Sequence, residues 1–574
     1  MNIVNRIILI ASIFPLFLQG QTKDKPKENW QNLDLKQDGV MGISTEKAYE
    51  LLKNKKGNPV IVAVIDGGID EEHEDLKSII WKNPSEVAGN GKDDDKNGYV
   101  DDVFGWNFIG SSDGTNVRYD NLEVVRLVRK LQDKYASIVN ASPLSDDERK
   151  EFNQYKKMVT DYMTKLENAR RGYESFRILK KTTDEIVSKI SKPIPTEKDF
   201  DNYKSANELE SKVLKAIKSE MKKDKDYVAF KKELDEGYDY FSSQVNYHLN
   251  IDFDPRDSVK DNYTNAFEKI YGNSDVTGPD AKHGTHVAGI IAAVRNNKIG
   301  INGIADNAKI MAVRAVPDGD ERDKDVANAI RYAVDNGAKV INMSFGKAYS
   351  WNKAVVDSAV KYAALKDVLL VHAAGNDAKN TDIEVNYPNR VFGDITPKDR
   401  PFIDPTLNQN QNMGGMNRIQ RPVKIAPDTT RFSLPKAANW IEVGASGWTN
   451  DENLIADFSN YGDRSVDVFA PGVKINSTMP GSKYEAQNGT SMASPVVSGL
   501  AALIRSYYPS LSAVQVKDII IRSVTKVDHK VKIREEGSKR NVRLDEISVS
   551  GGVVNAYNAI KLASEMSSTS SAKH

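Results

Sequence analysis

A serine carried to the start of a helix is the side chain of this sequence best placed for nucleophilic chemistry. Ser491 follows Asn488-Gly489-Thr490, and apolar residues repeat at helical spacing from Val496 to Ile504. Backbone N–H groups at a helix start have no intrahelical partner, so they can meet negative charge that develops beside the serine. A lone serine at a helix start is usually only an N-cap. A catalytic role also requires a base and an orienting carboxylate.

Two further stretches supply these partners. His283 opens His283-Gly284-Thr285-His286 and precedes an apolar run that predicts a buried helix. Asp66 ends the β-branched run Val60–Ile65, which is typical of a buried parallel strand. Open α/β sheets place their functional residues at the carboxyl ends of such strands. We therefore expect His283 to take the serine proton and Asp66 to orient the imidazole. His286 is the weaker candidate base, and we interpret it as a core histidine or as one that supports the catalytic residues.

The intervening segments predict the elements that position these residues. A strand at 310–315, a helix at 326–336 and a strand at 339–343 form a βαβ unit. A helix at 351–365 and a strand at 368–374 follow, and helices at 496–508 and 513–523 come after the serine. This alternation predicts an α/β fold with a mainly parallel central sheet.

Taken together, these stretches resemble the subtilisin-like serine proteases (subtilases, peptidase family S8). Asp66, His283 and Ser491 occur in that family's chain order of Asp, His and Ser. Four other segments match family landmarks in the same order: Val340–Gly346, Val371–Asp377, Phe458–Gly462 and Val468–Gly472. The resemblance covers residues 58–110 and 278–560. It implies a subtilisin-like three-layer fold and an enzyme that hydrolyses peptide bonds.

The resemblance also assigns roles to individual residues. Asn376 matches the asparagine whose amide completes the oxyanion hole. Ser344, Phe345 and Gly346 match the edge segment that pairs with the substrate backbone. Asp75 matches a carboxylate ligand of a structural calcium ion, and the loop after the histidine helix offers Asn297 as its partner. That loop is one residue longer than in the family, and the alternative for it is an ordinary asparagine-rich turn.

A second calcium loop is predicted from the residues themselves. Oxygen ligands at alternate positions, followed by glycine, are how a short loop wraps Ca²⁺. The fitting side chains are Asp93, Asp95, Asn97 and Asp101. The glutamate expected at the twelfth position is replaced by Phe104, so the loop is not an EF-hand and would need Asp102 or a distant acid to complete it. A solvated acidic turn is the alternative.

The composition narrows the class of protein. The 574 residues include 80 Lys and Arg against 80 Asp and Glu, so the net charge gives no argument for nucleic-acid binding.

Residues 1–21 begin with a positive charge and continue with a 12-residue apolar run, which predicts a secretory signal. The run is too short for a comfortable transmembrane span, and an uncleaved anchor is the alternative. We expect export to the periplasm or the medium. The sequence has no Cys, so bound calcium is the expected source of added stability.

The span of 217 positions from Asp66 to His283 is far longer than the catalytic fold needs. Apolar residues at heptad spacing predict packed helices between residues 120 and 250. The predicted organisation is therefore a signal (1–21), a first catalytic segment (22–119), an inserted helical subdomain (120–250), the rest of the catalytic domain (251–565, with a loop insertion at 380–439) and a disordered tail (566–574). We expect the inserted helices to shield the protease or to dock a protein partner; a flexible insertion without stable packing is the alternative.

The sequence therefore predicts an exported serine endopeptidase that acts on protein or peptide substrates through a Ser-His-Asp triad. Two alternatives stay open. One is a binding protein that kept the fold but lost catalysis. The other is a peptide-ligating or cyclising acyl transferase, which would use the same acyl-enzyme with an amine acceptor.

Overall fold

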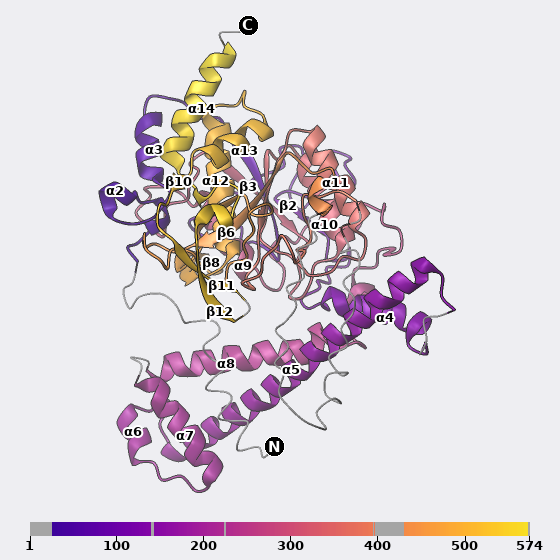
Figure 1. The fold of residues 1–574 in the computed structure, drawn as a ribbon, viewed down its shortest axis with the longest axis vertical. Helices are drawn as coiled ribbons and strands as arrows, with labels where there is room; N and C mark the ends of the chain where they lie inside the picture. Colours follow the sequence, from indigo (N-terminus) through magenta and orange to yellow (C-terminus); the bar gives the residue numbers. More distant parts are fainter. Residues whose placement is uncertain are drawn as a thin grey trace, which may run out of the picture. The chain divides into compact units, whose positions relative to one another are not determined.

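The computed structural model describes residues 26–138, 143–222, 226–393, 395, 430–535 and 537–571 (Figure 1). The predicted signal segment and most of the 380–439 loop lie outside these residues. The chain divides into two compact units. We call residues 26–118 and 255–571 the sheet unit and residues 119–254 the helical unit; the predicted bounds of the insertion were 120 and 250. Among the described residues, no helix combines the length and apolarity needed to cross a membrane.

One nine-stranded sheet organises the sheet unit. Its spatial order is β10-β13-β7-β6-β5-β4-β1-β3-β2, and all neighbours are parallel except β10 and β13. The strands are β1 Val60–Asp66, β2 Gly105–Asn107, β3 Ala308–Arg314, β4 Val340–Met343, β5 Leu369–Ala373, β6 Trp440–Ser446, β7 Val468–Pro471, β10 Thr525–Lys526 and β13 Gly552–Val553. This parallel sheet confirms the predicted α/β class.

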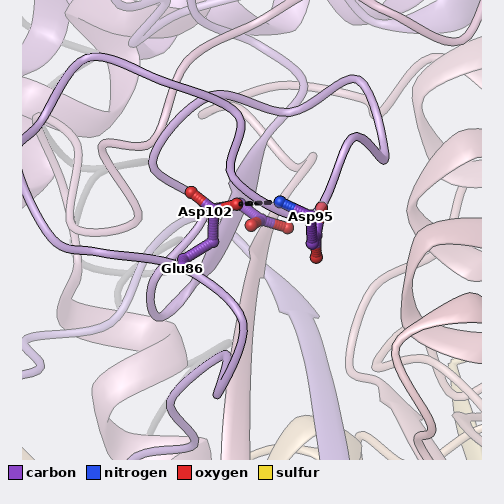
Figure 2. Close-up of side chains that lie close together, drawn as sticks. All are labelled: Glu86, Asp95 and Asp102. Carbon is purple, nitrogen blue, oxygen red and sulfur yellow. Dashed lines mark hydrogen bonds between the residues drawn. The ribbon is translucent and has the colours of Figure 1, made fainter.

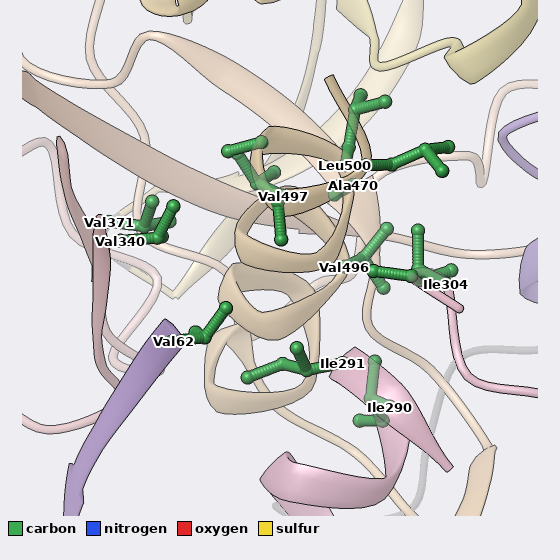
Figure 3. Close-up of a cluster of buried hydrophobic side chains, with 14 of the residues drawn as sticks. Val62, Ile290, Ile291, Ile304, Val340, Val371, Ala470, Val496, Val497 and Leu500 are labelled. Carbon is green, nitrogen blue, oxygen red and sulfur yellow. The ribbon is translucent and has the colours of Figure 1, made fainter. Parts of the chain in front are cut away.

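Alternation along each strand sends side chains into two separate cores. Val62 and Val64 of β1 join the core under α9 (Lys282–Ala292) and α12 (Thr490–Tyr507). Ala63 and Ile65 join the core under α10 (Asp323–Asp335) and α11 (Lys353–Leu365). Figure 3 shows the first core, where Val496 and Leu500 of α12 lie among side chains from the strands and from α9. Because both faces are covered, the strands are almost uniformly apolar, as expected for a buried parallel sheet.

The remaining elements of the sheet unit cover these faces or close its edges. Its helices are α2 Leu35–Asp38, α3 Thr45–Leu52, α9 Lys282–Ala292, α10 Asp323–Asp335, α11 Lys353–Leu365, α12 Thr490–Tyr507, α13 Ala513–Arg522 and α14 Ala556–Ser571. Two small antiparallel sheets pair β8 Ile475–Met479 with β9 Lys483–Gln487 and β11 Val531–Glu535 with β12 Ser538–Val542. Helix α14 continues to Ser571, so the segment predicted as a disordered tail is helical over most of its length.

The helical unit is built on one long helix. Its helices are α4 Glu123–Tyr135, α5 Asp146–Ile190, α6 Glu197–Asn202, α7 Glu208–Met221 and α8 Tyr227–Ser243. A capping box starts α5, in which Ser145 and Glu148 satisfy each other's backbone N–H groups. The carboxyl-terminal half of α5 shares an apolar core with α6, α7 and α8, including Phe176, Ile217 and Phe230. These helices correspond to the packed helices predicted from the heptad spacing.

The two ends of the helical unit are fastened to each other. The rings of Tyr119 and Tyr247 stack with centroids 4.1 Å apart. The N–H of Leu122 donates to the carbonyl of His248 at 2.9 Å. Arg129 donates to the carbonyls of Ile251 and Phe253 at 3.0 and 2.9 Å. We call this set of contacts the neck.

Candidate active site

The carboxyl end of β1 and the start of α9 place Asp66 beside His283. The Nδ1 atom of His283 lies 2.9 Å from both carboxylate oxygens of Asp66. The N–H of Gly67 donates to Asp66 Oδ1 at 2.8 Å and fixes the carboxylate. A Cβ atom on Gly284 would lie only 2.2 Å from the carbonyl of Gly68, so glycine is required for α9 to approach this turn.

The surroundings of His283 favour its charged form. The protein around the imidazole opposes protonation, but the charge and hydrogen bond of Asp66, helped by the charge of Asp280, outweigh this effect. The pKa of His283 is therefore raised above its ordinary value. The side chain is 42% exposed, so a ligand can reach the ring.

Helix α12 presents Ser491 in its first turn, where backbone N–H groups lack intrahelical partners. The Ser491 hydroxyl donates to the carbonyl of Ser344 at 3.0 Å. Within the described residues it makes no hydrogen bond to His283. Such contacts are often long in a ligand-free site and tighten when substrate binds.

Asn376 follows β5 and turns one side of its amide toward α12. Its Oδ1 accepts from the backbone N–H and from the hydroxyl of Thr490, each at 2.9 Å. Its Nδ2 makes no hydrogen bond within the described part of the chain. That nitrogen would lie 3.6 Å from a Cβ on Gly489, two residues before Ser491. Thr490 fixes the amide orientation; its role was not predicted, although it lies within the Gly-Thr-Ser motif.

The predicted substrate-binding segment leaves the end of β4. Ser344 is buried and contacts α12, whereas Phe345 is half-buried and Gly346 is exposed. The backbone groups of Phe345 and Gly346 make no hydrogen bonds to other described residues. The next residue, Lys347, forms an antiparallel bridge with Tyr387. This segment therefore offers unpaired backbone groups to an added strand.

His286 is buried one helical turn beyond His283. Its Nε2 donates to the carbonyl of Glu485 at 3.0 Å, because a carbonyl oxygen can only accept. Burial lowers the pKa of His286 to about 4, so the imidazole is neutral near pH 7. Its environment is that of a core residue.

The first predicted calcium pair lies together. The amide nitrogen of Asn297 donates to Asp75 Oδ1 at 2.6 Å, and the N–H of Ile301 donates to Oδ2 at 3.2 Å. Asp75 is fully buried, and burial raises its pKa despite these bonds. Among the described residues, no Lys or Arg contributes to the surroundings of the Asp75 carboxylate. A buried carboxylate without a cationic partner fits a bound cation.

The second predicted loop gathers a different set of side chains. Figure 2 shows the carboxylates of Glu86, Asp95 and Asp102 turned toward one another, with ligand atoms within 4.8 Å. Asp93 instead accepts from the N–H groups of Asn97 and Gly98 at 3.1 and 2.8 Å. Of the four loop side chains predicted as ligands, only Asp95 belongs to the observed cluster, together with Asp102, which was predicted as a residue that could complete the loop.

Local turn bonds explain this difference. Asp101 accepts from the N–H groups of Asn90 and Gly91 at 3.1 and 2.9 Å, so its carboxylate serves the loop backbone. Asn97 donates to Asp95 and Asp102 at 3.2 and 3.1 Å rather than presenting its oxygen.

The three-carboxylate cluster fits a cation. Glu86 Oε2 is buried and has no hydrogen-bond partner among the described residues. Burial raises the pKa of Asp102 to about 6, against the hydrogen bonds from Tyr332, Asn83 and Asn97 that lower it. A hard cation, which prefers oxygen ligands, would bind the unpaired oxygen of Glu86 and would offset the cost of burying the Asp102 carboxylate. Glu86 was not predicted, because it precedes the acidic run and follows no alternate spacing.

Comparison with known proteins places this chain in a family. The sequence matches the peptidase S8 model of the subtilase family over residues 57–541. It is 38% identical to a thermophilic serine proteinase of Bacillus sp. (strain AK1) over 225 residues, which cover 39% of this chain and 42% of that protein. It is 34% identical to Subtilisin BL of Lederbergia lenta over 244 residues, covering 42% of this chain and 70% of that protein.

Two further comparisons complete the set. Subtilisin E of Bacillus subtilis (strain 168) is 35% identical over 248 residues, covering 43% of this chain and 51% of that protein. A solved protease structure from Pseudoalteromonas arctica aligns over 95% of this chain and 100% of its own, with 17% identity and a TM-score of 0.45. The aligned region spans less than half of the Bacillus AK1 proteinase. The chain belongs to the subtilase family.

Proposed function

We propose that this chain is an exported serine endopeptidase that hydrolyses peptide bonds through an acyl-enzyme on Ser491. The observation that carries the proposal is the contact of His283 Nδ1 with both carboxylate oxygens of Asp66 at 2.9 Å. This contact fixes the tautomer and leaves Nε2 as the atom that takes a proton. Membership of the subtilase family supports the same class of reaction.

In the proposed mechanism, Ser491 Oγ attacks the scissile carbonyl carbon while His283 Nε2 takes the hydroxyl proton. Asp66 stabilises the imidazolium that forms, and Asp280 adds to this effect because its charge also favours protonation. His283 then gives the proton to the leaving amine. Water attacks the acyl-enzyme in the second half of the reaction and releases the acid product.

Two donors would stabilise the oxyanion. Asn376 Nδ2 is directed to the Gly489 side of α12, and the backbone N–H of Ser491 lies in the first helical turn. Losing one such donor typically lowers the rate about 100-fold to 1000-fold.

The proposed substrate is an extended peptide. The unpaired backbone groups of Phe345 and Gly346 support its binding as an added strand beside β4. Main-chain hydrogen bonds of this kind give affinity with little dependence on side-chain sequence.

Calcium is proposed as a structural ion. Asp75 with the 297–301 loop, and Glu86 with Asp95 and Asp102, are the residues that would hold it. The ion would supply charge compensation for buried carboxylates. Export to the periplasm or the medium is supported by the predicted signal segment, residues 1–21. A protein partner on the helical unit stays a prediction.

The test is labelling of the purified protein with a fluorophosphonate probe, alongside Ser491→Ala, His283→Ala and Asn376→Ala. A matched control is Ser494→Ala, because Ser494 is a buried serine one helical turn further along α12. We expect labelling and cleavage of a fluorogenic peptide by the wild type and the control, and loss of both in Ser491→Ala and His283→Ala.

Product analysis separates the alternatives. Hydrolysed termini in the presence of added amine support the endopeptidase, whereas ligated or cyclised products would replace it with an acyl transferase. If the folded wild type is not labelled and does not cleave the peptide, a binding protein would be the remaining alternative.

A further inference from the structure

A buried asparagine distant in sequence holds the segment that carries Asn376. Asn460 is 3% exposed and lies between β6 and β7. Its Nδ2 donates to the carbonyl of Ala374 at 2.8 Å. Its Oδ1 accepts from the N–H groups of Asp377 and Lys379 at 3.1 and 2.8 Å.

These bonds bracket Asn376 on both sides in the chain. Ala374 precedes Asn376 by two residues, and Asp377 and Lys379 follow it. The backbone N–H of Asn460 adds a bond to the carbonyl of Gly375 at 2.9 Å. Gly375 must lack a Cβ, because that atom would lie 2.4 Å from Asn460 Nδ2.

Two anchors from different segments of the chain therefore hold the Asn376 amide. From α12, Thr490 accepts from the N–H of Gly375 at 3.1 Å and donates to Asn376 Oδ1 at 2.9 Å. From the segment between β6 and β7, Asn460 holds the backbone that carries this amide. Both anchors use short polar side chains with few rotamers, so the segment has little freedom to move.

We propose that Asn460 is a positioning residue for the oxyanion hole: it sets the place of Asn376 Nδ2 without touching the substrate. The inference rests on the proposed function. Stabilisation of an oxyanion requires donors already about 2.7–3.1 Å from the developing charge. A small displacement of the Asn376 backbone therefore weakens binding of the transition state more than it weakens binding of the substrate.

The test is a double-mutant cycle between Asn460 and Asn376, read by kcat and KM on a fluorogenic peptide. Asn460→Ala is expected to lower kcat about 10-fold to 100-fold with KM within about 2-fold, which is the size of effect that a misplacement of about 1 Å produces. In the Asn376→Ala background the same substitution is expected to lower kcat by less than about 2-fold, because the donor it positions is gone.

Asn439→Ala is the matched control. Asn439 is also a buried asparagine, and its Nδ2 donates to the carbonyl of Val368 at 2.6 Å, just before β5 rather than after it. It is expected to lower the melting temperature to a similar extent while leaving kcat within about 2-fold. Should Asn460→Ala not fold, Asn460→Ser replaces it, since serine is too short to span all three backbone partners.

The outcomes are distinct. An unchanged kcat in folded Asn460→Ala, or an equal loss of kcat in both backgrounds, overturns the positioning role. A wild type that does not cleave peptide, or an Asn376→Ala variant with unchanged kcat, overturns the proposed oxyanion hole and this inference with it.

Discussion

His286 keeps its Nε2 3.0 Å from the carbonyl oxygen of Glu485, in a core from which water is excluded. Its Nδ1 is buried and has no hydrogen-bond partner among the described residues. The site therefore accommodates a neutral imidazole and disfavours the charged one.

This environment makes stability depend on pH. The pKa of His286 falls from its ordinary 6.5 to about 4, so between these values the unfolded chain binds a proton that the folded protein does not. The free energy of unfolding should decrease as pH falls from 6.5 to 4, by at most about 3–4 kcal/mol from this residue. Urea midpoints at several pH values measure the decrease. The decrease should be smaller in His286→Gln than in the wild type; equal decreases in both proteins would contradict the prediction.

Asp280 should influence the pH at which activity is lost on the acid side of the pH profile. Catalysis needs neutral His283, and the charge of Asp280 helps to raise the pKa of that imidazole. In Asp280→Asn the pKa of His283 should fall, so the rise of kcat/KM with pH should move to lower pH by less than about one unit. Asp113→Asn, which removes an exposed carboxylate paired with Lys260, is the control. A shift to higher pH would show that the sign is wrong.

The packing of α5 on α8 depends on two glycines. A Cβ on Gly172 would lie 2.2 Å from the Phe241 ring, and a Cβ on Gly237 would lie 2.2 Å from the Phe176 ring. Gly172→Ala should destabilise the helical unit by about 1–3 kcal/mol through overpacking, although alanine alone favours a helix. Hydrogen exchange in α5 and α8 measures this change. Phe241→Leu in the same chain should restore part of the loss; a more stable Gly172→Ala would refute the close approach.

Calcium removal should lower the melting temperature. An ion that binds only the folded protein adds about 2.7 kcal/mol when its free concentration is 100 times the dissociation constant. Glu86→Gln and Asp75→Asn should each reduce the gain from added calcium, whereas Asp101→Asn should not, because its carboxylate binds backbone N–H groups. Identical melting curves with and without a chelator would eliminate both sites.

Local sequence patterns predicted the ends of helices and strands well, but they predicted poorly which distant side chains meet. Strand β4 ends at Met343 and α11 ends at Leu365, as the apolar patterns predicted. The proximity of Asp66 and His283 followed from motif order rather than from any periodicity. The carboxylates of Asp93 and Asp101 bind backbone N–H groups of their own loop instead of facing the cluster. Ligand spacing alone does not tell whether a carboxylate faces an ion or caps its own turn.

Contacts between distant segments left no local pattern. Asn460 lies 84 positions after Asn376, and nothing in the Phe458–Gly462 motif indicates which backbone it binds. Gly172 and Gly237 likewise look like defects in a helix until the facing phenylalanines are known. These features depend on the packing of completed elements, so they appear only in the folded structure.

The neck of the helical unit has a consequence for how the chain assembles. Contacts of Tyr119 with Tyr247 and of Leu122 with His248 bring the ends of a segment of more than a hundred residues together. Once this segment has folded, the flexible loop between Asp66 and His283 is effectively shorter. Bringing the two residues together then costs less chain entropy. The insertion therefore behaves as a module whose acquisition or loss need not disturb the assembly of its host.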